Sequence, residues 1–224
     1  MNSDQELIYI WDAYCGWCHG FSKTVHRLHN NHPELPLTIL SGGLFTGNRS
    51  QAIGAFPHIA EANQRISQLT GAEFGSGYQE LLHDGSFVMD SELAAIGFYA
   101  LRSVAPEHAI ELAAAMQHAF YVEGKSLSEP ETYRTIALAN HIDAEAVLTL
   151  FHDPASQEAA RAEFADVSAL GVNSYPTLLL RSGNEYTSIG GTMNVEEIEA
   201  RLAKLHNVQP EAALYCAMDS PEGC

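Results

Sequence analysis

The chain has 224 residues, of which 46% are hydrophobic and 17% are charged, so it can bury a substantial core and does not belong to the disordered or low-complexity classes. Its 28 acidic and 11 basic residues give a formal net charge of -17, which disfavours binding to nucleic-acid backbones or anionic lipid surfaces. The length fits one large domain, or one small domain that carries an insertion.

The N-terminal residues Met1–Glu6 are acidic, and the apolar run that follows, Leu7–Trp11, is short. A secretory signal needs a basic start and an apolar stretch of about 7–15 residues. We therefore expect a cytoplasmic protein. In that compartment a close pair of cysteines is more often catalytic or metal-binding than structural.

The first 40 residues show a strand–helix–strand pattern. Leu7–Trp11 is apolar and β-prone, which predicts a strand buried on both faces. Phe21, Val25 and Leu28 recur at helical spacing and give the following helix one apolar face. Pro36–Leu40 predicts the second strand, so this segment is expected to form a βαβ unit with a right-handed crossover.

Residues 51–170 show helical patterns and almost no strand character. The predicted helix starts are a cap at Ser91, a first-turn proline at Pro106, a capping box at Ser128–Glu131, a cap at Asp143 and a start near Pro154. The last of these helices is expected to end near Leu170, with Gly171 in a left-handed conformation.

Strand character returns in Thr177–Arg181 and Tyr186–Ile189, which predict a β-hairpin with a loop over residues 182–185. A helix is expected over about 194–205. The predicted fold class is therefore α/β, with a four-stranded sheet built from both ends of the chain. We expect a discontinuous sheet domain at 6–48 and 172–205, an α-helical insertion domain at 49–171, and a C-terminal tail at 206–224.

Cys15 and Cys18 form a C-x-x-C pair between the first strand and the first turn of a helix. The unpaired backbone amides at a helix N-terminus carry partial positive charge, so a thiolate at Cys15 is expected to be stabilised there. We predict that Cys15 is the catalytic nucleophile and that Cys18 resolves the mixed disulfide.

Three other readings of the pair remain open. As half of a zinc site it lacks a second close pair, since Cys216 and Cys224 are distant in sequence. The segment Cys15–His19 also fits a haem-attachment motif, which would require export. The third reading is two buried, inert cysteines. We expect no metal ion, and no cofactor beyond a redox-active disulfide between Cys15 and Cys18.

The strand before Cys15, the C-x-x-C helix start, the long helical insertion and the segment Tyr175–Thr177 before a ββα end resemble the DsbA family of thioredoxin-like disulfide oxidoreductases, over about residues 6–205. Within it, Asp12–Gly20 is similar to the cytoplasmic branch of FrnE-like proteins and predicted protein disulfide isomerases. The resemblance implies a thioredoxin fold and thiol–disulfide oxidoreductase or isomerase activity. It also implies that Tyr175–Pro176 is a cis peptide bond and that both residues shape the substrate groove.

The sequence departs from DsbA proper in ways that bear on its chemistry. Gly16-Trp17 replaces Pro-His between the cysteines, so the resemblance implies a less oxidising couple. Tyr9 stands where DsbA proper has a glutamate six residues before the first cysteine. The nearest carboxylate is Asp12, expected either to accept the proton of Cys18 or to cap the helix.

Two neighbouring side chains have alternative roles. His19 either tunes the thiolate or is an exposed helix residue, and Trp17 either offers an apolar contact to substrate or packs against the insertion. Cys216 and Cys224 either form a second redox pair that recharges the first, or are two free thiols in the tail.

The expected partners are protein or small-molecule thiols and disulfides, and a redox partner that recycles the pair, with no nucleic acid and no membrane. The alternative function is a glutathione-dependent transferase or isomerase of the kappa class on the same fold. Such enzymes typically have serine at the first cysteine position, so retention of both cysteines argues against this alternative.

Overall fold

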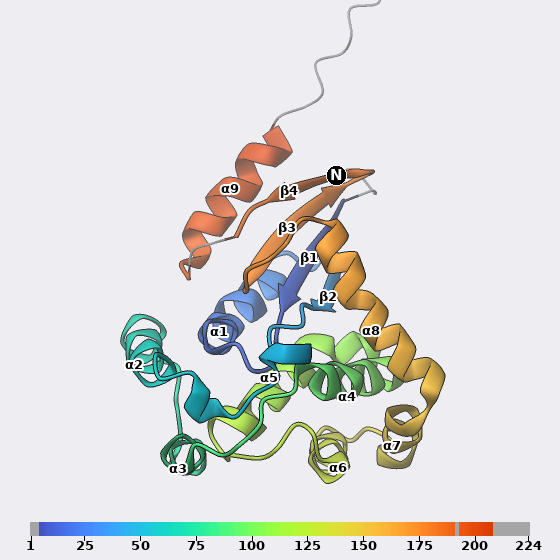
Figure 1. Cartoon of the computed structure of the whole chain (residues 1–224). Coiled ribbons are helices and arrows are strands. Elements are labelled where there is room, and N and C mark those ends of the chain that lie inside the picture. Colours follow the sequence, from blue (N-terminus) through green and yellow to red (C-terminus); the bar gives the residue numbers. More distant parts are fainter. Residues whose placement is uncertain (1–4, 191–192, 208–224) are drawn as a thin grey trace, which may run out of the picture.

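The computed structural model of the chain describes residues 5–190 and 193–207 (Figure 1). Its central sheet has the strand order β2-β1-β3-β4. The strands are β1 (Gln5–Trp11), β2 (Leu37–Ser41), β3 (Thr177–Ser182) and β4 (Glu185–Ser188). β1 pairs in parallel with β2 and antiparallel with β3, and β3 pairs antiparallel with β4. The two ends of the chain therefore build one four-stranded sheet, as predicted.

One long helix belongs to each terminal pair of strands: α1 (Gly16–Asn31) lies between β1 and β2, and α9 (Val195–Asn207) follows β4. Between β2 and β3 lie α2 (Ile59–Thr70), α3 (Ser76–Asp84), α4 (Ser91–Val104), α5 (Ala109–Tyr121), α6 (Pro130–Ala139), α7 (Ala144–His152) and α8 (Pro154–Ala169), with 3₁₀ helices at Gly47–Arg49, Ile53–Ala55 and Pro106–His108. Most of this helical segment lies beyond the C-terminal ends of β1 and β2 (Figure 1).

The central strand β1 is buried on both faces, which explains why it reads as a continuous apolar run. Its side chains alternate between the two faces. Leu7, Tyr9 and Trp11 belong to the main core with residues of α1 and α9, whereas Ile8 and Ile10 pack in a smaller cluster with α8. The sheet is thus covered by α1 and α9 on one face and by α8 on the other (Figure 1).

The predicted cap at Ser91 is wrong, because the preceding residue caps α4. Asp90 accepts hydrogen bonds from the amides of Glu92 and Leu93 at 2.9 and 3.1 Å. The Ser91 hydroxyl instead accepts the amide of Phe45 at 2.9 Å, which ties α4 to the loop after β2. A serine beside an aspartate has the right chemistry for a cap, but local sequence does not say which of the two is used.

Of the other predicted ends of helices and strands, the structure confirms some and contradicts others. The capping box at Ser128–Glu131 does not form, since the helix begins one residue later, with Pro130 in its first turn and no side-chain cap. The cap at Asp143 and the left-handed Gly171 are confirmed. The hairpin turn is tighter than expected, because β3 and β4 extend to Ser182 and Glu185. Among the helices described, none has both the length and the apolar composition needed to cross a membrane.

Candidate active site

Cys15 and Cys18 lie where β1 passes into α1, and both are free thiols. Cys15 is the N-cap residue of α1, and its sulfur accepts the backbone N–H of Cys18 at 3.4 Å. The cysteine itself therefore satisfies one of the unpaired amides at the helix start, and a thiolate there faces the positive end of the helix. Cys15 keeps 6% of its surface exposed and Cys18 keeps none, so the first cysteine is the one that a substrate can reach.

Cys18 is enclosed by apolar side chains and by Tyr9. Burial raises the pKa of the Cys18 thiol well above its usual value, and the hydrogen bond and charge of Cys15 raise it further. A backbone hydrogen bond from Asp12 acts in the opposite direction. The buried Cys18 therefore favours the protonated thiol over the thiolate.

The loop before β3 completes the site on the side opposite to α1. The peptide bond between Tyr175 and Pro176 is cis, as predicted. The Cys15 thiol lies 3.5 Å from the carbonyl oxygen of Tyr175. The Tyr175 hydroxyl donates to the carbonyl of Gly42, in the loop that follows β2. These contacts bring Cys15, Tyr175 and Pro176 together from segments that are 160 residues apart.

Asp12 is buried at the end of β1 and holds the backbone around the cysteines. Its carboxylate accepts the amides of Tyr14 at 2.9 Å and Leu44 at 2.7 Å. Burial raises the pKa of Asp12, while these amides and the Ser91 hydroxyl lower it. Because Cys15 is the N-cap of α1, the expectation that Asp12 caps this helix is wrong. The role of Asp12 as a proton acceptor for Cys18 stays a prediction.

His19 is bound to the helical insertion rather than exposed. Its ring stacks on Tyr121 with centroids 4.6 Å apart, and its Nε2 lies 2.8 Å from the carbonyl oxygen of Glu73. Burial is the main cause that lowers the pKa of His19, so the ring is neutral at pH 7. Trp17 is half-buried against the main core, and the Arg65 guanidinium lies 6.0 Å from its ring centroid. Both roles considered for Trp17 are compatible with this position.

A cavity of about 140 Å³ opens beside Cys15, between the start of α1 and the helical insertion. The pattern of the sequence did not single out the residues that α2, α3 and α5 contribute to it. Asn63 donates a hydrogen bond to the Tyr78 hydroxyl at 3.0 Å within its wall. The lining residues are Tyr14, Cys15, Gly16, Trp17, Leu44, Phe45, His58, Ile59, Ala62, Asn63, Ile66, Tyr78, Met89 and Tyr121.

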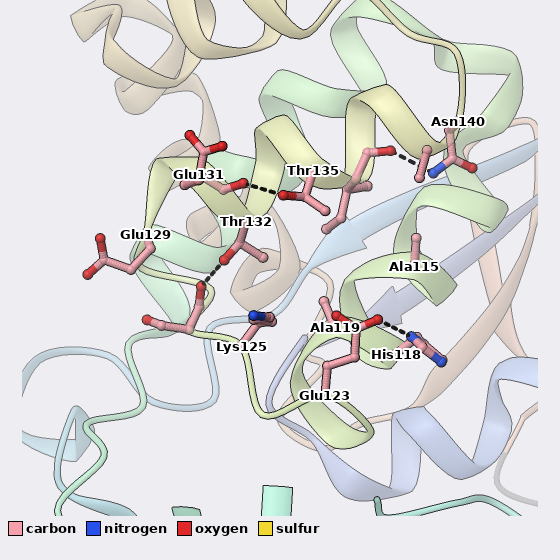
Figure 2. Close-up of a pocket in the computed structure, with 13 residues that line it drawn as sticks. Ala115, His118, Ala119, Glu123, Lys125, Glu129, Glu131, Thr132, Thr135 and Asn140 are labelled. Carbon is pink, nitrogen blue, oxygen red and sulfur yellow. Dashed lines mark hydrogen bonds and ion pairs between the residues drawn. The ribbon is translucent and has the colours of Figure 1, made fainter. Parts of the chain in front are cut away.

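A larger cavity of about 490 Å³ lies elsewhere, between α5, α6 and the loop that joins them (Figure 2). No cysteine lines it. Its polar side chains are largely engaged locally, since Thr132 donates to Ser126, Thr135 donates to Glu131, and His118 pairs with Glu123. We therefore place the candidate active site at the smaller cavity, which Cys15 lines.

Two predicted site residues, Cys216 and Cys224, lie outside the described residues, so their proposed second redox pair stays a prediction. Among residues 5–190 and 193–207, no group of three or more His, Cys, Asp or Glu side chains is arranged to hold a metal ion.

Comparison with known proteins gives a family and a set of similar structures. A family model described as a DSBA-like thioredoxin domain matches residues 7–203. A comparison with curated protein sequences finds no significant match. A Nitrosomonas europaea protein whose assignment as a protein disulfide isomerase is itself provisional superimposes with a TM-score of 0.81 at 23% identity, over 92% of this chain and 100% of its own.

The cytosolic disulfide reductase DsbM from Pseudomonas aeruginosa is also similar. It shares 26% identity with a TM-score of 0.78, over 91% of this chain and 100% of its own. A structure of DsbM with GSH gives 27% identity and a TM-score of 0.75, over 90% of this chain and 98% of its own.

Proposed function

Because this chain belongs to the family of DSBA-like thioredoxin domains, we propose that it is a thiol–disulfide oxidoreductase that works through Cys15 and Cys18. The observation that carries the proposal is the arrangement of three groups. Cys15 caps a helix and borders a cavity, Cys18 is buried one turn behind it, and the cis Tyr175–Pro176 segment lies opposite. Each group has a place in thiol–disulfide exchange.

The reductive reaction balances over two steps. The Cys15 thiolate attacks one sulfur of a substrate disulfide, the substrate S–S bond breaks, and the leaving sulfur takes up a proton. Cys18 then attacks the sulfur of Cys15, and the second substrate sulfur leaves with the proton that Cys18 gives up. Two electrons and two protons pass to the substrate, and a Cys15–Cys18 disulfide forms.

We further propose that the protein acts as a cytoplasmic reductase and that glutathione recharges it. Two glutathione molecules would reduce the Cys15–Cys18 disulfide and leave as glutathione disulfide. This proposal is supported by the similarity to DsbM, which is named a cytosolic disulfide reductase and has been solved with GSH. The isomerase activity expected from the sequence would use the same attack by Cys15, followed by transfer to another thiol of the substrate.

The test uses a background in which Cys216 and Cys224 are replaced by serine, so that tail thiols do not contribute. In this background Cys15→Ser should abolish glutathione-dependent reduction of insulin. Cys18→Ser should instead accumulate a mixed disulfide with glutathione at Cys15, seen by mass spectrometry. Full activity of the Cys15→Ser variant would refute the proposal, and modification of Cys18 rather than Cys15 would reverse the assigned roles.

A further inference from the structure

The cavity beside Cys15 holds three polar side chains that the reaction described above does not use. Asn63 of α2, Tyr78 of α3 and Tyr121 of α5 line this cavity and keep 6%, 1% and 1% of their surfaces exposed. Asn63 donates a hydrogen bond from its Nδ2 to the Tyr78 hydroxyl at 3.0 Å. This bond leaves the Oδ1 atom of Asn63 and the hydroxyl of Tyr121 for other partners.

These two polar atoms converge on one point next to the cysteine pair. A Cβ atom placed on Gly16 would lie 3.2 Å from Asn63 Oδ1 and 3.9 Å from the Tyr121 hydroxyl oxygen. Gly16 directly follows Cys15, and no side chain of its own fills that point. Within the described part of the chain, neither polar atom has a hydrogen-bond partner. Buried polar groups without partners are uncommon in folded proteins and call for an explanation.

Packing fixes the orientation of both groups. The ring of Tyr121 stacks on His19 with centroids 4.6 Å apart, and it meets the rings of Tyr78 and Phe74 at 5.1 and 5.4 Å. The hydrogen bond to Tyr78 orients the side-chain amide of Asn63. A ligand that binds these atoms therefore meets groups that are already in place, which lowers the entropic cost of binding.

The rest of the cavity is apolar and suits a neutral group. Its walls include Leu44, Ile59 and Ile66, and among the described residues that line it there is no Asp, Glu, Lys or Arg. Burial raises the pKa of Tyr121 well above its ordinary value, so its hydroxyl keeps the proton that it can donate. An ionic group would lose its water here without gaining a counter-charge, whereas an amide offers one N–H donor and one carbonyl acceptor.

The volume of about 140 Å³ fits one part of a substrate. For comparison, an apolar cavity of about 150 Å³ holds a benzene molecule. There is thus room for one amide group with its attached carbon atoms. Since Cys15 lines the same cavity, an amide bound there belongs to the part of the substrate that adjoins the disulfide.

We propose that Asn63 and Tyr121 bind the amide group next to the substrate's disulfide: Asn63 Oδ1 accepts the amide N–H, and the Tyr121 hydroxyl donates to the amide carbonyl. The site thus selects disulfides of peptide-linked cysteines over disulfides that carry no amide. This inference rests on the proposed function, because it requires that Cys15 attacks the disulfide held there.

The experiment compares two uncharged disulfides, so that the net charge of the protein affects neither. Bis(2-hydroxyethyl) disulfide has no amide, whereas the disulfide of N-acetylcysteine amide has amides next to both sulfurs. Pre-reduced protein with serine at positions 216 and 224 is mixed with each, and the loss of free Cys15 and Cys18 thiols is followed by alkylation and mass spectrometry. Each rate constant is divided by that of the same disulfide with dithiothreitol, which corrects for chemical reactivity.

The measured quantity is the ratio of the corrected rate constants, amide disulfide over hydroxyethyl disulfide. We expect a ratio of about ten or more in the parent and a fall of about tenfold in Asn63→Leu and in Tyr121→Phe, because each variant loses one hydrogen bond to the amide. Tyr121→Phe removes a single oxygen atom and keeps the ring. If Asn63→Leu does not fold, Asn63→Ala takes its place with the same expected fall.

Tyr133→Phe is the matched control. Tyr133 is also fully buried, and its hydroxyl donates to the carbonyl of Leu127 within the helical insertion. It does not line the cavity beside Cys15. Its loss should lower the free energy of unfolding and keep the ratio of the parent.

The outcomes separate the two proposals. A parent protein whose Cys15 and Cys18 stay free thiols with both disulfides would refute the proposed function and this inference with it. A parent that reacts with both, beside an unchanged ratio in Tyr121→Phe or in the Asn63 variant, would overturn this inference alone. An equal fall in Tyr133→Phe would also overturn it, since the effect would then come from lost stability.

Discussion

At the scale of the single residue, two positions require glycine, because a tyrosine ring occupies the space that a side chain would need. A Cβ atom on Gly42 would lie 2.1 Å from the Tyr175 ring, and one on Gly97 would lie 1.9 Å from the Tyr133 ring. The first ring belongs to the candidate active site and the second to the helical insertion. The same substitution at the two positions therefore separates an effect on chemistry from an effect on packing.

We predict that Gly42→Ala lowers kcat/KM for disulfide reduction by about tenfold or more, because it displaces Tyr175 and with it the carbonyl beside Cys15. Gly97→Ala should lower the free energy of unfolding by about 1–3 kcal/mol through overpacking, with the activity of the folded fraction unchanged. Denaturant unfolding and steady-state kinetics on both variants check this. Equal kcat/KM values in Gly42→Ala and the parent would contradict the assigned role of Tyr175.

His19 makes stability depend on pH through the contact between α1 and the helical insertion. Burial lowers the pKa of His19 in the folded state, whereas the unfolded chain has an ordinary histidine pKa of about 6.5. The unfolded state therefore binds the proton first as the pH falls. The contribution of the neutral ring is complete above about pH 6.5 and is lost as the pH falls below that value.

We predict that the free energy of unfolding decreases less between about pH 7.5 and pH 5.5 in His19→Phe than in the parent. The substituted ring can still stack on Tyr121 but loses the bond to Glu73, so the variant should start from a lower stability at pH 7.5. Denaturant titrations at both pH values test this. Parallel pH profiles for the two proteins would show that another group is responsible.

At the scale of the structural element, a buried ion pair joins α8 to α4 and β2. Arg102 of α4 pairs with Glu163 of α8, and Arg102 also donates to the carbonyl of Ile39 in β2. Glu163 accepts the amide of Ser41 at 3.0 Å. Burial lowers the pKa of Arg102 to about 10.

Glu163→Gln should reduce the free energy of unfolding by about 3–5 kcal/mol, because it leaves the Arg102 charge buried without a counter-charge. The double variant Arg102→Met with Glu163→Leu should recover most of that loss, since it removes both charges together. Chemical denaturation of the single and double variants measures the coupling. A double variant less stable than Glu163→Gln would show that the backbone hydrogen bonds, rather than the charge pair, hold α8.

The helices and strands also show which structural features local sequence can predict and which it cannot. The apolar runs of β1 and β3 predict strands because burial on both faces demands them. The start of α4 was misplaced by one residue, because Ser91 is used by the amide of Phe45, a contact across 46 residues. Whether a serine caps a helix or binds a distant loop cannot be recognised from its neighbours in the sequence alone.

At the scale of the whole molecule, the candidate site is only partly visible in the sequence. Cys15 and Cys18 carry a motif, and Pro176 stands at a strand start that requires an explanation. The opposite wall of the cavity has no such pattern. Asn63 and Tyr121 lie on the faces of two amphipathic helices, where they are indistinguishable from core positions until the helices are placed.

The net charge of -17 acts over distances longer than any contact in the site. We predict that kcat/KM for the dicationic disulfide cystamine falls several-fold as ionic strength rises from about 20 to about 300 mM, because salt screens its attraction. The value for anionic glutathione disulfide should rise over the same range. A rise for cystamine and a fall for glutathione disulfide would mean that Arg65, beside Trp17, outweighs the field of the whole molecule.

The pairing of the first strand with the third has a consequence for the newly made chain. Gln5 pairs with Ser182, so β1 cannot acquire this neighbour until some 175 further residues have been synthesised. At about 5–20 residues per second, this leaves the nascent cysteine pair without its Tyr175 loop for roughly 10–30 s. Throughout that interval Cys15 stands open to any disulfide in its surroundings, and its protection on the ribosome depends on the reducing power of the compartment rather than on the fold.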